Sequence, residues 1–300
     1  MTLFDAPERP DRVDARRAGQ RDRDRAAPSG PLCRVALGLA YDGAGFHGFA
    51  AQPGQRTVAG VLADALGRIT GHEVALTCAG RTDAGVHARA QVVHADLDAA
   101  ALARRLGSSL EPGTELPGLA RSLSRQGGPE LLVWRAVVAE PGFDARRSAT
   151  GRRYRYLIDA TARPDPVLRH SVWLVGAPLE LAPMRLAADP LIGEHDFAGF
   201  CRRPPDRPSG PLTRIVHDAR LVELGAGRYR FEIEAQAFCQ QMVRSIVGSL
   251  VAIGTGQAYP SDIFARLRSG SRDGAPPLAP ACGLSLVAVR YPEVLGGSWS

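Results

Sequence analysis

The feature of this sequence that most constrains its fold is the order of its predicted strands and helices. Nearly the same order is predicted in the first and in the second half of the chain. Short runs rich in Val, Ile, Tyr and Phe indicate strands, and apolar residues at helical spacing indicate helices. In the first half, strands are predicted at residues 33–41, 73–80, 89–97 and 131–140, and helices at 57–70 and 98–107. The resulting β-α-β-β-α-β order is the ferredoxin-like, or split βαβ, arrangement.

The second half of the sequence approximates the first. Strands are predicted at residues 152–160, 212–224, 228–238 and 283–291, and helices at 181–193 and 239–254. Two segments rich in Gly, Pro and Ser, at 109–130 and 201–211, are predicted to be loops. The sequence therefore predicts an α+β fold of two ferredoxin-like halves joined around a central antiparallel sheet, with a cleft between them.

Composition marks the ends of the folded region. Residues 1–30 contain seven Arg, six acidic residues and few large apolar side chains. Such a segment buries too little surface to offset the entropy lost on ordering. We predict a disordered tail at 1–30, an N-terminal half at 31–148, a C-terminal half at 149–293 and a C-terminal tail at 294–300.

Charge and hydrophobicity limit the kind of partner. A net charge of +6 and a pI near 9.4 favour a polyanion such as a nucleic acid. All 37 basic residues are Arg, however, a bias that is typical of genomic base composition and weakens this argument. No apolar run is long enough to span a bilayer, and no apolar block of a secretion signal is evident. We expect a cytoplasmic protein without membrane contact.

The cysteines indicate neither a disulfide framework nor a zinc site. They are scattered, odd in number and form no C-x-x-C pair. The five are Cys33, Cys78, Cys201, Cys239 and Cys282. We expect them to be free thiols.

A charged motif bracketed by glycines, GRTDAGVHA at residues 80–88, lies between two predicted strands. One interpretation is an ordinary turn, since Asp and Gly both favour turns. The other is a reactive site, because Asp83 is ionised at neutral pH and needs no helper base to attack an electrophile or accept a proton. Arg81 would favour that charged form, and Gly85 would let a ligand approach the backbone closely.

The same window raises the question of a metal site. Asp83, His87 and His94 are all potential ligands, but no HxH or HExxH pattern accompanies them. Metal sites usually need three or four convergent ligands. The pattern therefore favours an interpretation without a metal.

The segment RRYRY at residues 152–156 has a structural and a functional interpretation. Strand alternation places Arg152, Tyr154 and Tyr156 on one face, and Arg153 and Arg155 on the other. In the structural interpretation the tyrosines fill a core. In the functional interpretation a ring stacks on an unpaired base, beside arginines that bind phosphates.

Arg244 lies on the predicted helix at 239–254. Met242, Ile246 and Leu250 trace an apolar face on that helix. Arg244 is either a solvated helix residue or the partner of a buried carboxylate.

Taken together, these motifs resemble the tRNA pseudouridine synthase A family, whose signature is similar to GRTDAGVHA. The other similar segments, in the family's order, are YDGAGFHGF, QPGQRTV, FDARRSATGRRYRY, GEHDFAGF, AFCQQMVRSIVGSLVAIGTGQ and APACGLSLVAVRYP. The resemblance extends from Tyr41 to Tyr291. Two segments differ from the family's usual residues: GFA at 48–50 stands for Gly-Trp-Gln, and FDAR at 143–146 for Phe-His-Ala-Arg.

The resemblance implies a role for five residues. Asp83 would be the catalytic aspartate, Arg244 its basic partner, and Tyr154 the aromatic residue that contacts the target base. Arg81 and Arg146 match motif positions near the RNA. The implied activity is isomerisation of uridine to pseudouridine in the anticodon stem-loop of tRNA, at tRNA positions 38–40, by a homodimer that uses no cofactor and no metal.

Several alternatives stay open at this point. Asp83 would attack the ribose C1′, attack the base or assist elimination at the sugar, and the sequence does not distinguish these routes. Two other functions compete with the synthase: a non-catalytic RNA-binding protein, for which Asp83 would be dispensable, and a metal-dependent nuclease that uses Asp83, His87 and His94. Neither accounts for all of these motifs in this order.

Overall fold

The computed structural model describes residues 30–107, 109–163, 165–203 and 209–300. The tail expected at residues 1–30 lies outside the described residues, except for Gly30, and so does part of the loop expected at 201–211.

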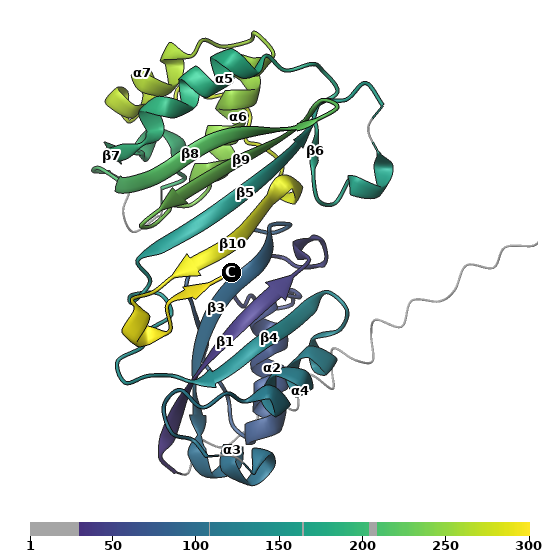
Figure 1. Ribbon diagram of the computed structural model, residues 1–300, viewed down its shortest axis with the longest axis vertical. Helices are drawn as coiled ribbons and strands as arrows, with labels where there is room; N and C mark the ends of the chain where they lie inside the picture. The colour runs from purple at the N-terminus through teal and green to yellow at the C-terminus, as the bar shows by residue number, and fades with distance from the viewer. Residues whose placement is uncertain (1–29, 108, 164, 204–208) are drawn as a thin grey trace, which may run out of the picture.

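The described strands form one sheet of eleven strands (Figure 1). They are β1 (Leu32–Tyr41), β2 (Thr77–Cys78), β3 (His87–Asp98), β4 (Leu131–Val138), β5 (Gly151–Asp159), β6 (Trp173–Leu174), β7 (Gly193–Asp196), β8 (Thr213–Gly225), β9 (Arg228–Ala235), β10 (Leu284–Arg290) and β11 (Ser298–Trp299). The main path runs β4-β1-β3-β10-β5-β9-β8-β7, and β2, β6 and β11 pair with β3, β5 and β10. Neighbours on this path are antiparallel, except that β3 and β10 are parallel.

Six α-helices lie in the described part of the chain, three from each half of the sequence. They are α2 (Val58–Thr70), α3 (Ala99–Leu106), α4 (Pro117–Gly127), α5 (Leu181–Ala188), α6 (Met242–Gly254) and α7 (Ser261–Ser269). Figure 1 shows α5, α6 and α7 at one end of the molecule and α2, α3 and α4 at the other. The α+β fold around a central sheet is therefore as predicted. None of the described helices has the length and apolar character that crossing a membrane requires.

The helix ends follow from local side-chain chemistry. The Thr57 hydroxyl accepts a hydrogen bond from the Gly60 amide at 3.2 Å and caps α2. Gly71 ends the same helix in the left-handed conformation, which glycine adopts without a steric penalty. Asp98 caps α3 in the same way as Thr57 caps α2, by accepting from the Ala101 amide.

The prediction of a loop at 109–130 is wrong, because this segment contains α4. Pro117 occupies the first turn of the helix, where its missing N–H costs no hydrogen bond. Leu119 and Leu123 are completely buried at helical spacing. The many Gly, Pro and Ser residues that indicated a loop lie mostly at the ends and on the exposed side of this short helix. Helix α7 was also not predicted, and of the strand expected at 73–80 only Thr77 and Cys78 pair as β2.

Strand alternation in β5 separates two environments, as the sequence predicts. Tyr154 and Tyr156 are buried, and the Tyr156 hydroxyl donates to the Pro280 carbonyl at 2.7 Å. Arg153 and Arg155 point to the other face and pair with two buried carboxylates of β9, Glu234 and Glu232. The face that carries these ion pairs is therefore polar, whereas the tyrosine face belongs to the core.

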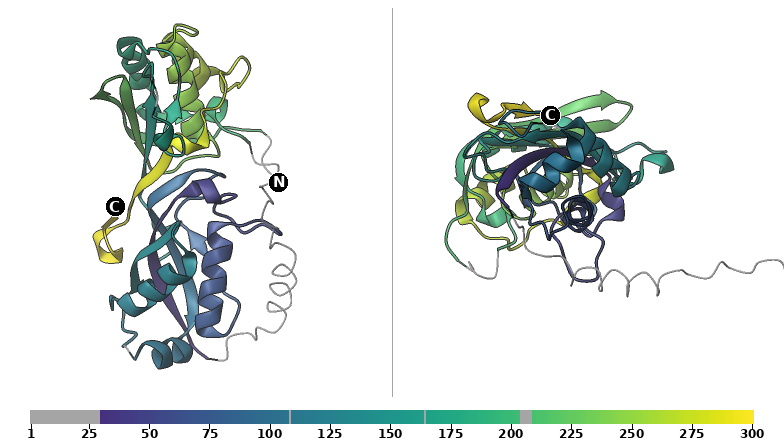
Figure 2. Two further views of the ribbon diagram at one scale, coloured as in Figure 1. Left: turned by 90° about the vertical axis from the view of Figure 1, so that its right-hand side faces the viewer. Right: turned by 90° about the horizontal axis from the view of Figure 1, so that it is seen from below.

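The C-terminal residues return to the middle of the molecule (Figures 1 and 2). Strand β11 pairs with β10, and Trp299 is only 2% exposed. Its ring lies 5.6 Å from that of Trp134, and the Arg135 guanidinium lies over it at 4.5 Å. The tail expected at 294–300 is thus folded onto the sheet.

The expectation of five free thiols is wrong for two of the cysteines. Cys201 and Cys239 form a disulfide with a Cα–Cα distance of 5.8 Å, within the range that a disulfide spans. Cys33, Cys78 and Cys282 are free. The paired cysteines are 38 positions apart and gave no spacing signal, so only the tertiary fold brings them together.

Candidate active site

The loop at residues 80–86 carries Asp83 and lies at the centre of the sheet. It connects β2 to β3, and the first residues of β3 pair with β10 through His87 with Ser285 and Ala88 with Leu286. This parallel pairing is where strands from the two halves of the sequence meet (Figure 1). The loop that carries Asp83 is thus followed in sequence by the two residues of β3 that pair with β10.

A glycine-rich loop at residues 43–48 packs against the Asp83 loop. A Cβ on Gly43 would collide with the Val86 carbonyl oxygen, and a Cβ on Gly48 would lie 3.0 Å from the Thr82 carbonyl oxygen. Gly48 also has a φ of +90°, which favours glycine. The Phe49 amide donates to the Thr82 carbonyl at 3.0 Å. The glycines therefore permit a backbone-to-backbone contact that supports the loop from one side.

Hydrogen bonds from buried side chains of β1 and β3 also support the Asp83 loop. The Tyr41 and Thr82 hydroxyls hydrogen bond at 2.8 Å, and the Gln91 amide nitrogen donates to the Gly80 carbonyl at 2.6 Å. Gln91 has no exposed surface, and Tyr41 is 5% exposed. Because these bonds are shielded from water, they restrict the conformations of the loop.

Arg244 reaches the Asp83 carboxylate from the other half of the sequence. Its Nη1 donates to Asp83 Oδ2 at 3.1 Å, and its Nε donates to the Ala279 carbonyl at 2.8 Å. The two side chains are 16% and 29% exposed. An ion pair that is partly shielded from water is stronger than one on the open surface. The pair thus orients the Asp83 carboxylate at a position that solvent still reaches.

The start of α6 sets the direction of Arg244. Gln241, the residue before the helix, has a φ of +66°, which is uncommon for a residue other than glycine. Gly248 allows the segment at 277–279 to lie on the helix, because a Cβ there would collide with the Pro277 carbonyl oxygen. That segment supplies the Ala279 carbonyl that orients Arg244.

Tyr154 lies beside the Asp83 loop and is 7% exposed. Its ring meets that of Phe238 edge to face, with a centroid separation of 5.0 Å. A Cβ on Gly80 would lie 3.5 Å from the Tyr154 hydroxyl oxygen, so the hydroxyl lies at the start of the loop. Burial raises the pKa of this phenol, and the Asp83 carboxylate acts in the same direction. In the part of the chain that the structure describes, the hydroxyl makes no hydrogen bond.

Arg81 and Arg146 are exposed near the same site. Burial raises the pKa of the Cys78 thiol to about 11, and Arg81 and Arg146 oppose that shift, so both guanidiniums lie near Cys78. Within the described residues, neither side chain has a hydrogen bond or an ion pair. Their donors are therefore available to a ligand.

Asp144 shapes the turn that presents Arg146. Its Oδ1 accepts hydrogen bonds from the amides of Arg146 and Arg147, each at 2.8 Å. Burial raises the pKa of the Asp144 carboxyl, but these two amides outweigh that effect, and the pKa lies below its ordinary value. The carboxylate thus caps the turn in its charged form.

Comparison with known proteins decides the family. A tRNA pseudouridine synthase A of Frankia casuarinae is 44% identical over 267 residues, which cover 87% of this chain and 90% of that protein. One of Corynebacterium glutamicum is 42% identical over 266 residues, with the same coverages. A family model described as tRNA pseudouridine synthase matches residues 187–292. The chain belongs to the tRNA pseudouridine synthase A family.

The family predicted from the motifs is thus confirmed. Among solved structures, a crystal structure of a Cbf5-Nop10-Gar1 complex covers 84% of this chain and 48% of its own, at 14% identity and a TM-score of 0.33. That score is too low to carry an argument. The identity to tRNA pseudouridine synthases A along most of the chain carries the assignment instead.

The residues that a metal site would need are not gathered in this member of the tRNA pseudouridine synthase A family. His94 Nδ1 accepts a hydrogen bond from the Ala145 amide at 2.9 Å, and the Asp83 carboxylate pairs with Arg244. The described residues contain no group of three or more His, Cys, Asp or Glu side chains placed to hold a metal ion. This arrangement gives the nuclease hypothesis no support.

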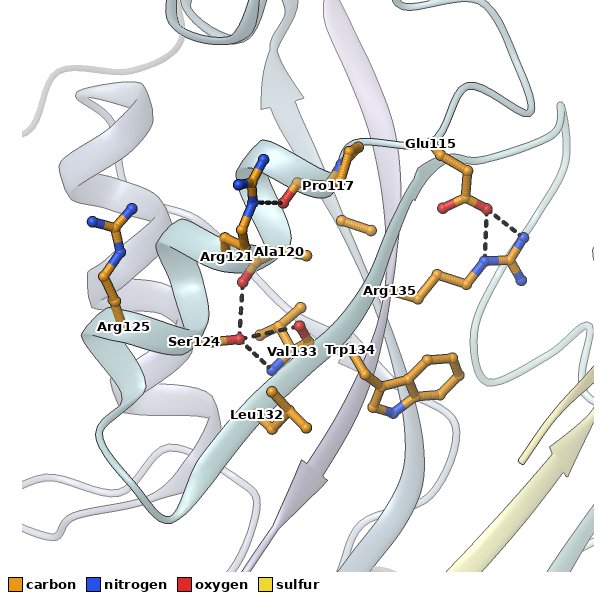
Figure 3. Close-up of a pocket in the computed structure, with 11 residues that line it drawn as sticks. Glu115, Pro117, Ala120, Arg121, Ser124, Arg125, Leu132, Val133, Trp134 and Arg135 are labelled. Carbon is orange, nitrogen blue, oxygen red and sulfur yellow. Dashed lines mark hydrogen bonds and ion pairs between the residues drawn. The ribbon is translucent and has the colours of Figure 1, made fainter.

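A groove of about 860 Å³ lies away from Asp83, between α4 and β4 (Figure 3). Its lining includes Arg121, Arg125 and Trp134, but none of the predicted site residues. The Ser124 hydroxyl accepts from the Val133 amide at 2.9 Å and lies 3.1 Å from its carbonyl oxygen (Figure 3). Since β4 ends the main path of the sheet, this contact satisfies backbone groups on an open edge. We interpret the groove as part of that edge structure.

Sequence reasoning missed several residues that build the site. Phe238, Gln91 and Tyr41 position Tyr154 and the Asp83 loop, yet each lies in a strand-like or apolar run where its contacts have no local signature. Arg152 had one usable signal, because alternation placed it on the same face as Tyr154. The structure shows it to be 8% exposed.

Proposed function

We propose that this protein isomerises uridine to pseudouridine in the anticodon stem-loop of tRNA. Family membership supports the reaction and the class of RNA. The observation that carries the proposal within this chain is the pair of Asp83 and Arg244, 3.1 Å apart and partly exposed. A charged, oriented carboxylate that solvent can reach is what the reaction requires of its catalytic residue.

The reaction breaks one bond to the sugar and forms another. The bond between uracil N1 and ribose C1′ breaks, the base turns, and C5 bonds to C1′. The proton on C5 leaves and N1 gains one, so the reaction is balanced without an oxidant or a group donor. Asp83 acts as a carboxylate at the sugar or at the base, and Arg244 orients it through their hydrogen bond.

We assign Tyr154, Arg81 and Arg146 to binding of the RNA. We place the target base, which must leave its stack to react, against Tyr154, whose hydroxyl has no partner in the described residues. We place phosphates at Arg81 and Arg146, because their guanidiniums are exposed and uncommitted among those residues. The resemblance also supports a homodimer in which one tRNA contacts both subunits.

The first test replaces the carboxylate. Asp83→Asn keeps the side-chain shape and removes its charge, so we expect pseudouridine formation to be abolished while tRNA binding and folding are retained. Release of tritium from a tRNA transcript that contains [5-³H]uridine reports loss of the C5 hydrogen. Asp96→Asn is the matched control, because it breaks a different Asp–Arg pair, with Arg34 at 2.8 Å, and should leave activity at the parental level.

Substituted transcripts locate the target. Replacing the uridines of the anticodon stem-loop with cytidine should abolish tritium release, whereas the same replacement in other stems should not. A parent protein that binds tRNA without tritium release would support the RNA-binding alternative. An Asp83→Asn protein that turns over at the parental rate would show that the site is wrong.

A further inference from the structure

The Arg152 side chain forms an unusually complete set of hydrogen bonds. It is 8% exposed, and all five of its N–H donors have an acceptor among the described residues. Nε and Nη2 both donate to the Ala79 carbonyl, at 3.2 and 2.9 Å. Nη1 donates to the carbonyls of Ala149 and Gln236 at 3.0 and 2.6 Å, and Nη2 donates to that of Arg146 at 2.7 Å.

The four acceptors belong to three segments that build the candidate site. Ala79 immediately precedes the loop with Asp83. Arg146 and Ala149 lie in the turn between β4 and β5 that presents the Arg146 guanidinium. Gln236 begins the connection from β9 to α6, which contains Phe238 and leads to Arg244. One side chain therefore contacts the segment before Asp83, the turn that carries Arg146 and the connection that contains Phe238.

The anchor of this side chain is itself rigid. The backbone of Arg152 pairs with Ala235 of β9 and Val289 of β10, so β5 is held on both sides at this residue. The guanidinium projects from that fixed point onto the three segments. Arg152 thus joins the centre of the sheet to the loops at its surface.

The charge and the planar shape of the guanidinium both determine which acceptors Arg152 can bind. Every acceptor is a backbone carbonyl, and no carboxylate pairs with Arg152 among the described residues. Burial lowers the pKa of this guanidinium, because removing a charged group from water is costly. Only a planar group with five donors reaches four carbonyls at once; the ammonium of lysine has three donors on one atom.

We propose that Arg152 is a positioning residue for the reaction, which holds the segments of Asp83, Arg146 and Phe238 in one fixed arrangement. This inference rests on the proposed function for its catalytic readout. Arg152 acts through its contacts to those backbones, and not through the reacting atoms. Its loss should therefore lower the rate of the chemical step more than the affinity for tRNA.

Arg152→Lys and Arg153→Lys form a matched pair of variants on adjacent residues of β5. Arg153 points to the opposite face and pairs with Glu234 at 2.8 Å through Nε, away from the site segments. We expect Arg152→Lys to lower kcat about 10- to 100-fold, the range expected when reacting groups are misplaced by up to about 1 Å. The Kd for tRNA should change by less than about threefold, and Arg153→Lys should keep parental kcat and Kd. An Arg152→Lys protein that is folded and keeps the parental kcat would overturn the proposal.

Hydrogen exchange in the parent protein tests the same idea without a variant that must fold. If one guanidinium holds the three segments, then residues 79–85, 144–150 and 236–241 should open as one unit, with equal protection and equal response to denaturant. Independent opening of the three segments would overturn the proposal. This result does not depend on activity, so it stays distinct from the proposed function. That function fails separately if the parent protein forms no pseudouridine in tRNA.

Discussion

At the scale of single residues, the buried tyrosines differ in whether the hydroxyl has a hydrogen-bond partner among the described residues. Tyr156 and Tyr291 donate their hydroxyls to the carbonyls of Pro280 and Ala145, each at 2.7 Å, and Tyr41 hydrogen bonds to Thr82. Tyr154 is similarly buried, but its hydroxyl has no partner among the described residues and lies beside the Asp83 loop. This contrast favours a role for the Tyr154 hydroxyl toward a substrate.

We expect Tyr154→Phe to separate stability from activity. The change removes no internal hydrogen bond of the described residues, so the free energy of unfolding should change by less than about 0.5 kcal/mol. Turnover should fall on the order of 10²-fold, because the hydroxyl would hydrogen bond to the base or transfer a proton. Urea denaturation and tritium release from labelled tRNA measure the two effects.

Tyr156→Phe is the control for this prediction. It removes the bond to Pro280 and should cost about 1 kcal/mol of stability while leaving turnover unchanged. A fully active Tyr154→Phe protein would restrict Tyr154 to stacking or to the core. Tyr154→Ala distinguishes those two, since loss of a core ring costs about 3–5 kcal/mol of stability and a partly exposed stacking ring costs less.

At the scale of the element, strand β9 carries two buried carboxylates that join neighbouring strands. Glu234 binds Arg153 of β5 and Arg290 of β10, and Glu232 binds Arg155 of β5. Burial raises the pKa of both carboxyls, but the bound guanidiniums outweigh it, so both pKa values lie below the ordinary value. These charged groups thus couple the stability of the sheet to pH.

The sign of that coupling follows from the lowered pKa values. A carboxyl with a lower pKa in the folded than in the unfolded state stabilises the fold above the unfolded pKa of about 4.3, and this contribution is lost as the pH falls through the folded pKa. We expect Glu234→Gln to cost about 1–3 kcal/mol at pH 7 and much less at pH 3. Urea midpoints at both pH values test this.

The exposed Glu223 of β8 is the matched control for Glu234. Glu223→Gln should change the urea midpoint little at either pH, because a solvated carboxylate has nearly the same surroundings in the folded and unfolded states. A cost for Glu234→Gln that is equal at pH 7 and pH 3 would show that packing, and not charge, is what β9 contributes there.

At the scale of the whole molecule, one continuous sheet brings the candidate site together. Strand β10, near the end of the chain, lies between β3 and β5, and its parallel pairing with β3 joins strands from the two halves of the sequence. We propose that residues 31–148 and 149–293 are the two halves of the fold. Asp83 comes from the first of these and Arg244 from the second, so neither half alone would contain the pair.

We expect the protein to be a homodimer in solution. A neighbouring subunit would then hold the body of a tRNA whose stem-loop occupies the site of the first. Light scattering at the concentration used for activity should give twice the 31.9 kDa of one chain. A mass of one chain under conditions where tRNA is modified would rule out a dimer as the active form.

The sequence by itself determined the local features of this protein. Periods of two and about 3.6 residues located β5 and α2, and alternation placed Arg152 on the face of Tyr154. The contiguous motif around Asp83, together with the other segments, was enough to identify the family. Each of these signals is contained within a short stretch of consecutive residues, so it can be recognised without knowledge of the fold.

Only the tertiary structure decided which distant residues meet. Arg244 and Asp83 are 161 residues apart, Arg152 and its acceptor Ala79 are 73 apart, and the partners of the disulfide are 38 apart. Such contacts depend on strand order, and above all on the insertion of β10 between β3 and β5, which no local period encodes. The buried donors of Arg152 and the uncommitted hydroxyl of Tyr154 became visible for the same reason, because burial and hydrogen-bond partners are properties of the assembled sheet.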